Sequence, residues 1–235
     1  TMTIAPHSTL VGDGRGNTTL SRRSDSDLFV IGEGVALSQL GFVGNGNGRG
    51  GGCFVFKGAS GRQSLREIRA VNFDGPVLYF ERGAGSQFSA SNCIFSRLNA
   101  PTGSERYAVV IDPAQQLSAV PRKFELIETN GQCAFDFGGC NDVFISSSFL
   151  GDLKYSDDSR GVLIVNSRVA NQAILTVRGH NNALVLCNLA PQVILAKNAD
   201  NVVIGPNSYN RTPLLDQSGN GRNLVFMAEQ DYTPD

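Results

Sequence analysis

Three carboxylates occupy corresponding places in the sequence, each beside a short apolar segment. Glu81 follows VLYF, Asp112 follows AVVI, and Asp136 lies between two phenylalanines in AFDF. If these segments are neighbouring strands, Glu81 and Asp112 lie about 5 Å apart, one strand spacing. That separation suits retaining hydrolysis of a glycoside, and Asp136 would widen it toward the inverting one. Like charges this close raise one pKa, so the set predicts an acid and a base.

Side chains beside these carboxylates are the candidates for substrate binding: Lys57, Tyr79 and Arg82. The inserted segments 98–107 and 113–123 flank the same region and could form the walls of a groove. The competing interpretation is an ordinary solvated surface. Lys57 and Glu81 would then form a cross-strand ion pair of little energetic weight.

The glycine-rich run GNGRGG at 46–51 matches the spacing of a phosphate-binding loop. Such a loop must open a helix, whose N-terminus holds the phosphate. The segment that follows, CFVFKG, has the alternation of a strand. The run is therefore interpreted as a turn, and no nucleotide or other cofactor is expected.

The spacing of the remaining residues does not predict a metal site or a catalytic nucleophile. Asp157 and Asp158 are adjacent and would need a turn to face one calcium ion. His7 and His180 are too far apart in sequence to predict a shared triad, so both are assigned to surface turns. The five cysteines fit no zinc spacing and are interpreted as free, buried thiols: Cys53, Cys93, Cys133, Cys140 and Cys187.

The elements that would position these residues repeat along the chain. In the C-terminal half, units begin at Ala134, Leu153, Ile174, Val193 and Leu214, so the spacings are 19, 21, 19 and 21 residues. Each unit contains two alternating apolar segments separated by turns rich in Gly, Asn and Asp. Units in the N-terminal half are longer, about 24 to 31 residues, because loops are inserted.

Alternation with period two predicts strands, and no unit has the period of a helix. One unit cannot bury its apolar side alone, whereas stacked units can. Inward columns are then expected at Phe54 and Phe56, Leu78 and Phe80, Val109 and Ile111, and Phe135 and Phe137. Asparagines near the ends of second strands are expected in left-handed turns, stacked on one another: Asn72, Asn92, Asn130 and Asn188.

The fold prediction is all-β: a single-stranded, right-handed parallel β-helix of about ten coils. One domain covers residues 1–228, followed by a polar tail at 229–235. The right hand is expected because parallel crossovers have it. The main alternative, an antiparallel sandwich, would not need a fixed register of about 20 residues.

The opening segment TMTIAPHSTLVGDGRGNTTL resembles the first coils of the right-handed β-helix (pectate lyase-like) superfamily, including phage tailspikes. The matching residues are Gly12, Gly14 and Thr18 or Thr19. The resemblance covers nearly the whole chain as architecture, but the local motif marks only the fold. It implies either a polysaccharide lyase or hydrolase, or a non-catalytic virion protein. It also implies a homotrimer, which would cover outward apolar residues such as Val55, Val110, Leu186 and Val203.

The composition of the chain argues against several classes of binding partner. Net charge is −1 with acids and bases mixed along the chain, so nucleic acid is not expected. Apolar runs are too short for membrane insertion. The sequence has no Trp for a broad sugar platform. No capping helix precedes Thr1, so we expect either a fragment or neighbours that cover the ends.

Two functions follow as expectations. The first is a bacteriophage structural or adhesive protein (tailspike, tail fibre or capsid decoration), located in the virion and contacting host surface polysaccharide. The second is a polysaccharide depolymerase, a hydrolase or lyase in a secreted or extracellular location, that uses Glu81, Asp112 and Asp136. The remaining alternative is a bacterial surface or secreted glycan-modifying enzyme.

Overall fold

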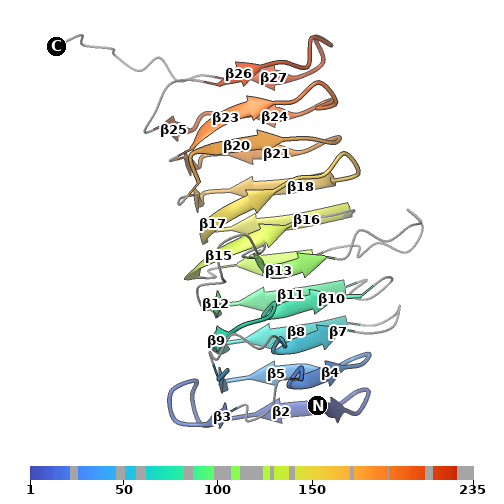
Figure 1. Ribbon diagram of the computed structural model, residues 1–235, viewed down its shortest axis with the longest axis vertical. Helices are drawn as coiled ribbons and strands as arrows, with labels where there is room; N and C mark the ends of the chain where they lie inside the picture. The colour runs from blue at the N-terminus through green and yellow to red at the C-terminus, as the bar shows by residue number, and fades with distance from the viewer. Residues whose placement is uncertain are drawn as a thin grey trace, which may run out of the picture.

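Short apolar segments form the strands of the computed structural model, and each lies against its counterpart in the next repeat. Phe54 aligns with Leu78, which aligns with Val109, and these pairings are parallel. The same parallel pairing continues along the chain and builds an upright stack of coils with β1 and β27 at opposite ends (Figure 1). Strands and turns make up the described residues, and helices are absent from them.

The structure describes residues 1–21, 26–45, 51–56, 62–81, 87–97, 107–111, 124–127, 130–137, 141–169, 172–189, 191–209 and 214–226. Within these, the side chains at 97, 107–108, 110–111, 124–127, 130–134, 141 and 208–209 lie outside the description. The predicted tail at 229–235 also lies outside it.

The strands form three faces. The first face begins with β1 (Met2–Ile4), β4 (Phe29–Ile31), β7 (Phe54–Phe56), β10 (Leu78–Phe80), β13 (Tyr107–Ile111) and β15 (Asn130–Asp136). It resumes in a separate three-stranded sheet made of β20 (Ile174–Val177), β23 (Gln192–Leu195) and β26 (Leu215–Asp216).

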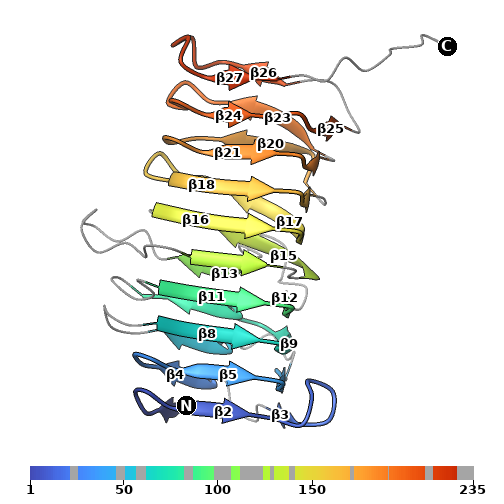
Figure 2. The ribbon, with the colours of Figure 1, turned by 180° about the vertical axis from the view of Figure 1, so that it is seen from behind.

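The second face is one continuous ten-stranded sheet, seen from its outer side in Figure 2. Its strands are β2 (Thr9–Val11), β5 (Ala36–Ser38), β8 (Arg62–Arg66), β11 (Gln87–Ser91), β14 (Phe124–Ile127), β16 (Asn141–Ser146), β18 (Arg160–Val165), β21 (Ala183–Val185), β24 (Val203–Ile204) and β27 (Leu224–Val225). Each successive coil contributes one strand to this sheet.

The third face contains β3 (Thr19–Ser21), β6 (Gly41–Val43), β9 (Arg69–Phe73), β12 (Ile94–Arg97), β17 (Phe149–Lys154), β19 (Arg168–Val169), β22 (Asn188–Leu189) and β25 (Ser208–Tyr209). Two long strands turn the corner between faces. β15 pairs with both β12 and β13, and β17 pairs with β15 along its whole length. The third and first faces are therefore continuous at these two coils.

The predicted inward columns form the core. Phe54, Phe56, Leu78, Phe80, Val109, Phe135 and Phe137 are each at most 2% exposed. Aromatic rings stack from coil to coil, as Phe56 and Phe80 do with centroids 4.4 Å apart and nearly parallel planes. Each such buried side chain contributes about 1.5–3 kcal/mol of hydrophobic stabilisation. The side chain of Ile111 lies outside the description.

A column of left-handed residues ends the second face at successive coils. These residues have φ between 45° and 56°: Gln39, Glu67, Asn92, Ser147, Asn166 and Leu186. Five of these residues, all but Asn92, have a described backbone N–H that donates to the next coil, as Glu67 does to Ser91 O at 3.0 Å. The parallel solenoid therefore turns this corner with one residue in a conformation that most side chains disfavour.

The asparagine predictions were partly correct. Asn72 and Asn92 are left-handed, with φ of 62° and 49°. Asn188 instead lies within β22, paired with Arg168, and Asn130 is the first residue of β15. Among described residues, stacked amides occur in another column, where Asn201 Nδ2 donates to Asn181 Oδ1.

The glycine-rich run is followed by strand β7, as predicted, and not by a helix. Residues 46–50 lie outside the description. Gly51 has φ of 86°, a conformation that suits a turn. The hand of the coils and the trimer stay predictions.

Candidate functional site

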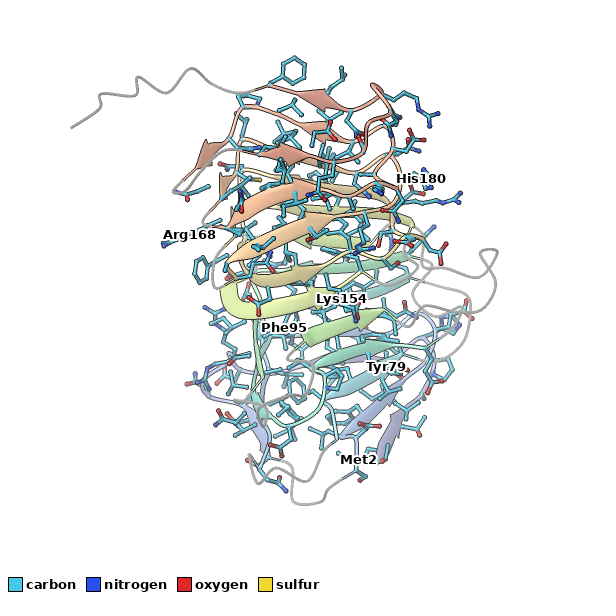
Figure 3. The ribbon with its side chains drawn as sticks, turned by 45° about the horizontal axis from the view of Figure 1, so that its top comes forward. Met2, Tyr79, Phe95, Lys154, Arg168 and His180 are labelled. Carbon is cyan, nitrogen blue, oxygen red and sulfur yellow. The ribbon has the colours of Figure 1, made fainter. Side chains whose placement is uncertain are left out.

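Two of the three predicted carboxylates, Glu81 and Asp136, lie on the outer side of the first face. Glu81 directly follows β10, and its backbone N–H donates to Phe56 O at 3.1 Å, so it continues the ladder. Tyr79 and Asp136 share one outward column through Val110. Tyr79 and Lys154 lie along this face in Figure 3. Glu81 and Tyr79 are partly exposed. The predicted residues Lys57, Arg82 and Asp112 lie outside the described residues.

One strand separates the two described carboxylates. β13 lies between β10 and β15, and Asp136 is in register with Tyr79, two residues before Glu81. Glu81 and Asp136 are therefore two strand spacings apart across the face and two residues apart along it, roughly 11–12 Å in all. That exceeds both the retaining and the inverting separations. The part assigned to Asp112, which would lie between them, stays a prediction.

Asp136 is buried and forms an ion pair. Its residue is 7% exposed, and its Oδ2 lies 2.9 Å from Lys154 Nζ. The sequence did not indicate this pair, because the repeat alignment placed Ala134 opposite Leu153. In the structure Phe135 is opposite Leu153, and this one-residue shift brings Lys154 beside Asp136.

An open cavity of about 690 Å³ lies beside this ion pair, on the same face. Its lining comes from the end of β17, the turn that follows, and β20: Leu153, Lys154, Tyr155, Ser156, Asp157, Asp158, Gln172, Ile174, Thr176 and Arg178. The cavity lies where the first face is interrupted. β17 pairs with β15 and β19, whereas β20 pairs with β23 in the separate sheet.

A side chain replaces the main-chain ladder at this interruption. Gln172 Oε1 accepts the backbone N–H of Leu153 at 3.0 Å. Gln172 Nε2 is buried and has no hydrogen-bond partner among the described residues. An unsatisfied buried donor costs about 1–3 kcal/mol. Unsatisfied groups of this kind are unusual in native proteins.

The rim of the cavity carries a second ion pair. Arg178 Nη1 lies 3.3 Å from Asp157 Oδ1, and the two side chains are 46% and 67% exposed. Gly179 follows Arg178 with φ of 80°, and a Cβ there would lie 2.1 Å from Ser159 O. Only glycine fits this position, so the backbone beside Arg178 is closely packed against the preceding coil.

The two histidines are far apart, as expected. His7 is an exposed turn residue in the first coil, with φ of 58°. His180 lies at a corner several coils away, labelled in Figure 3, where its Nδ1 is 3.4 Å from Asp200 Oδ2. Arg222 Nε lies 2.8 Å from Asp200 Oδ1. This corner is a row of charged side chains along the turns.

The described cysteines agree with the prediction of free, buried thiols. Cys53, Cys93 and Cys187 are buried thiols that form no disulfide. Burial raises the pKa of the Cys93 thiol from 9.0 to about 11 and also raises that of Cys187. A raised pKa leaves little thiolate, so neither has the character of a nucleophile. The side chains of Cys133 and Cys140 lie outside the description.

The described residues contain no group of three or more His, Cys, Asp or Glu arranged to hold a metal ion. Asp157 and Asp158 are both exposed, and Asp157 faces Arg178. The described residues also include no helix that is long and apolar enough to span a membrane.

An apolar strip covers the outer side of the second face in its C-terminal half. Phe144, Leu163, Ala183, Val203 and Leu224 follow one another in register, with Val165 and Val185 beside them. All seven are exposed or partly exposed, and Leu163 and Leu224 are 37% and 54% exposed. In earlier coils the corresponding positions are Ser64 and Ser89, and Arg66 and Ser91.

The residues predicted to be apolar and outward-facing differ in how much of each is exposed. Leu186 is 62% exposed and Val203 is partly exposed. Val55 is only 4% exposed, so its own chain covers it and no partner is needed there. The side chain of Val110 lies outside the description.

No protein-family description, curated protein or solved structure matches this chain. The parallel β-solenoid is therefore established by the strand pairing alone.

Proposed function

We propose that this protein is a structural and adhesive β-solenoid of the bacteriophage virion, of the tailspike, tail-fibre or capsid-decoration kind. Its rods associate side by side as a homotrimer and contact host surface polysaccharide. The sequence resemblance to pectate lyase-like β-helix proteins and tailspikes supports this class. The observation that carries the proposal is the apolar strip on the second face.

The strip is a specific feature of five coils and not a general property of the face. In earlier coils the column that contains Phe144 holds Ala36, Ser64, Ser89 and Glu125. The column that contains Val165 holds Ser38, Arg66, Ser91, Ile127 and Ser146. Five strands at about 4.8 Å give a strip roughly 20 Å long. Exposure of such an apolar row to water is unfavourable, and burial against another surface lowers the free energy of the protein. A second copy carries the same row with the same repeat, so the side chains of two strips can interdigitate.

Sedimentation measures this association directly. We expect the 25.1 kDa chain to sediment as a trimer at tens of micromolar. Leu163→Lys with Val203→Lys should give a monomer with an unchanged β-sheet spectrum, since both side chains point outward. Ser64→Lys with Ser89→Lys is the matched control in earlier coils and should leave the trimer intact. A monomeric wild type at these concentrations would refute the proposed assembly.

Adhesion is tested with intact capsular and O-antigen polysaccharides. Co-sedimentation of the protein with a polysaccharide whose chain length stays constant supports the adhesive function. Absence of binding to every polysaccharide from the host that carries the phage would refute it.

A depolymerase, acting as hydrolase or lyase, is the second candidate. It is favoured by the position of Glu81 and Asp136 on the same outer face, on either side of β13, which Asp112 follows in the sequence. Shortening of the polysaccharide would support this reading. Glu81→Gln and Asp112→Asn should then abolish the shortening, and full activity in both variants would show that the assigned site is wrong.

A further inference from the structure

The cavity between β17 and β20 has features of a binding site that the predicted carboxylates do not include. The first face pairs strand to strand up to β17 and again from β20 onward, but its ladder is interrupted between them. A continued ladder would satisfy Leu153 N–H through the main chain, whereas here Gln172 does so with its side chain. The buried Gln172 Nε2 has no partner in the described part of the chain.

This interruption carries a free-energy cost, as does the buried Gln63 Oε1 on the second face. An unsatisfied amide donor costs about 1–3 kcal/mol. Local costs of this kind in an otherwise regular fold are typical of functional sites. The cavity is also the place where the regular outer surface of the first face becomes concave.

The polar side chains around the cavity are held in place by the fold. Lys154 is oriented by Asp136, which is buried and 2.9 Å away. Arg178 is oriented by Asp157 at 3.3 Å and directly precedes Gly179, a backbone position where only glycine fits. A guanidinium has five donors, so Arg178 retains donors beyond its ion pair. The cavity therefore presents positioned donors rather than freely moving side chains.

The charge and surface of the cavity indicate the class of ligand. Three carboxylates (Asp136, Asp157 and Asp158) stand against two cations, Lys154 and Arg178, so an acidic ligand gains no net attraction. The hydroxyls of Ser156 and Thr176 also line the cavity, together with Ile174, which is 52% exposed. Donors, acceptors and one apolar contact side by side match a sugar ring, whose hydroxyls both donate and accept.

We propose that this cavity is a binding subsite for a neutral saccharide, with Arg178 and Thr176 in contact with sugar hydroxyls. Gln172 is a positioning residue, since it keeps β17 and β20 apart at the cavity floor. The proposal rests on the adhesive function proposed above and names the place and the chemical class of the ligand. It is independent of Glu81 and Asp112.

The test uses the wild-type chain, two cavity variants and one matched control. Arg178→Met and Thr176→Val remove a donor without adding charge. Arg168→Met removes the same kind of side chain from the third face, where Arg168 lies over the Phe149 ring (Figure 3). The probes are malto-, cello- and mannohexaose, with hexagalacturonate as the acidic counterpart. Binding is followed by saturation-transfer NMR and titration calorimetry, with melting temperature as the control for folding.

We expect at least one neutral hexasaccharide to bind wild type. Arg178→Met should weaken binding about tenfold, the loss of one charge-assisted hydrogen bond. Thr176→Val should also weaken it, whereas Arg168→Met should not. Tighter binding of hexagalacturonate would overturn the assigned class, and absence of transfer to every neutral probe would overturn the site. If the Arg178→Met variant binds intact polysaccharide as strongly as wild type does, the proposed site is refuted. The proposed adhesive function would not be refuted by that result.

Discussion

At the scale of single residues, Asp136 illustrates how position along a strand changes the chemistry of a carboxylate. In the sequence it is an outward acid in a row with other charges. In the structure it is 7% exposed and joined to Lys154, whose side chain remains 40% exposed. A buried carboxylate held by a cation stabilises the fold only while both partners are present.

Removing Lys154 should therefore cost more than removing a surface cation. Lys154→Met should lower the free energy of unfolding by about 1–3 kcal/mol, because a buried carboxylate loses its cation. Arg178→Met is the control, since its partner Asp157 is 67% exposed. The control should lose no more than about 1 kcal/mol. Urea unfolding of both variants measures the difference, and equal losses would contradict the burial argument.

Cys93 should make stability depend on pH in the alkaline range. Burial raises its pKa in the folded chain from 9.0 to about 11. Between these values the unfolded thiol has lost its proton and the folded thiol keeps it. The unfolded state binds fewer protons, so the free energy of unfolding falls as pH rises, by up to about 2–3 kcal/mol.

Urea unfolding at pH 8 and pH 10.5 measures this fall. Cys93→Ala should lose less stability between the two pH values than wild type does. Cys187→Ala should show a change in the same direction, since burial raises that pKa too. An unchanged pH dependence in Cys93→Ala would show that another group is responsible.

At the scale of elements, the corner after the second face imposes the same left-handed conformation on chemically different residues. Glutamine, glutamate, asparagine, serine and leucine all occupy it. Tertiary stacking therefore determines the conformation, and local preference only adjusts its cost. Leucine is the least suited of these, because a side chain without a local hydrogen bond gains nothing in the left-handed region.

Leu186→Asn should stabilise the protein. Leu186 has φ of 55° and is 62% exposed, so little packing is lost. We expect a gain of about 0.5–1 kcal/mol in the free energy of unfolding, measured by urea titration at low protein concentration. Leu163→Asn, an exposed leucine within β18, should not stabilise, because asparagine is unfavourable in strands. A loss of stability in Leu186→Asn would contradict this account of the corner.

At the scale of the whole molecule, each coil contacts mainly its two neighbours. Second-face register advances by one coil from Leu163 to Ala183 and again to Val203. Stability in such a solenoid is a sum of coil and interface contributions. Whole coils should therefore be removable, provided that the register is kept.

Deletion of residues 183–202 removes one coil and joins Asn182 to Val203, which then lies opposite Leu163. We expect a folded, cooperatively melting β-protein with a melting temperature a few degrees lower. Deletion of residues 183–192 is the control, since it removes half a coil and places Val193, an inward residue, at an outward position. Far-UV circular dichroism during heating compares them. Similar unfolding of both would contradict a coil-by-coil fold.

The sequence by itself determined the solenoid. Period-two alternation, repeated about every 20 residues between polar turns, has one low-energy solution: parallel strands stacked on equivalent strands. It also determined which residues point inward, since the core column from Phe54 to Phe137 follows directly from alternation. Strand stacking and side-chain direction depend on local alternation and on its repeat along the chain. A single register shared by all coils satisfies both.

Only the tertiary structure decided the candidate site. A one-residue shift between β15 and β17 placed Lys154 beside Asp136, and a break in the first face between β17 and β20 formed the cavity. Neither change alters the alternation pattern, so neither leaves a mark in the sequence. Burial of Val55 and exposure of the apolar strip likewise depend on what packs over each outward side chain. The physical reason is that pattern fixes a side chain's direction, whereas its surroundings come from neighbouring coils.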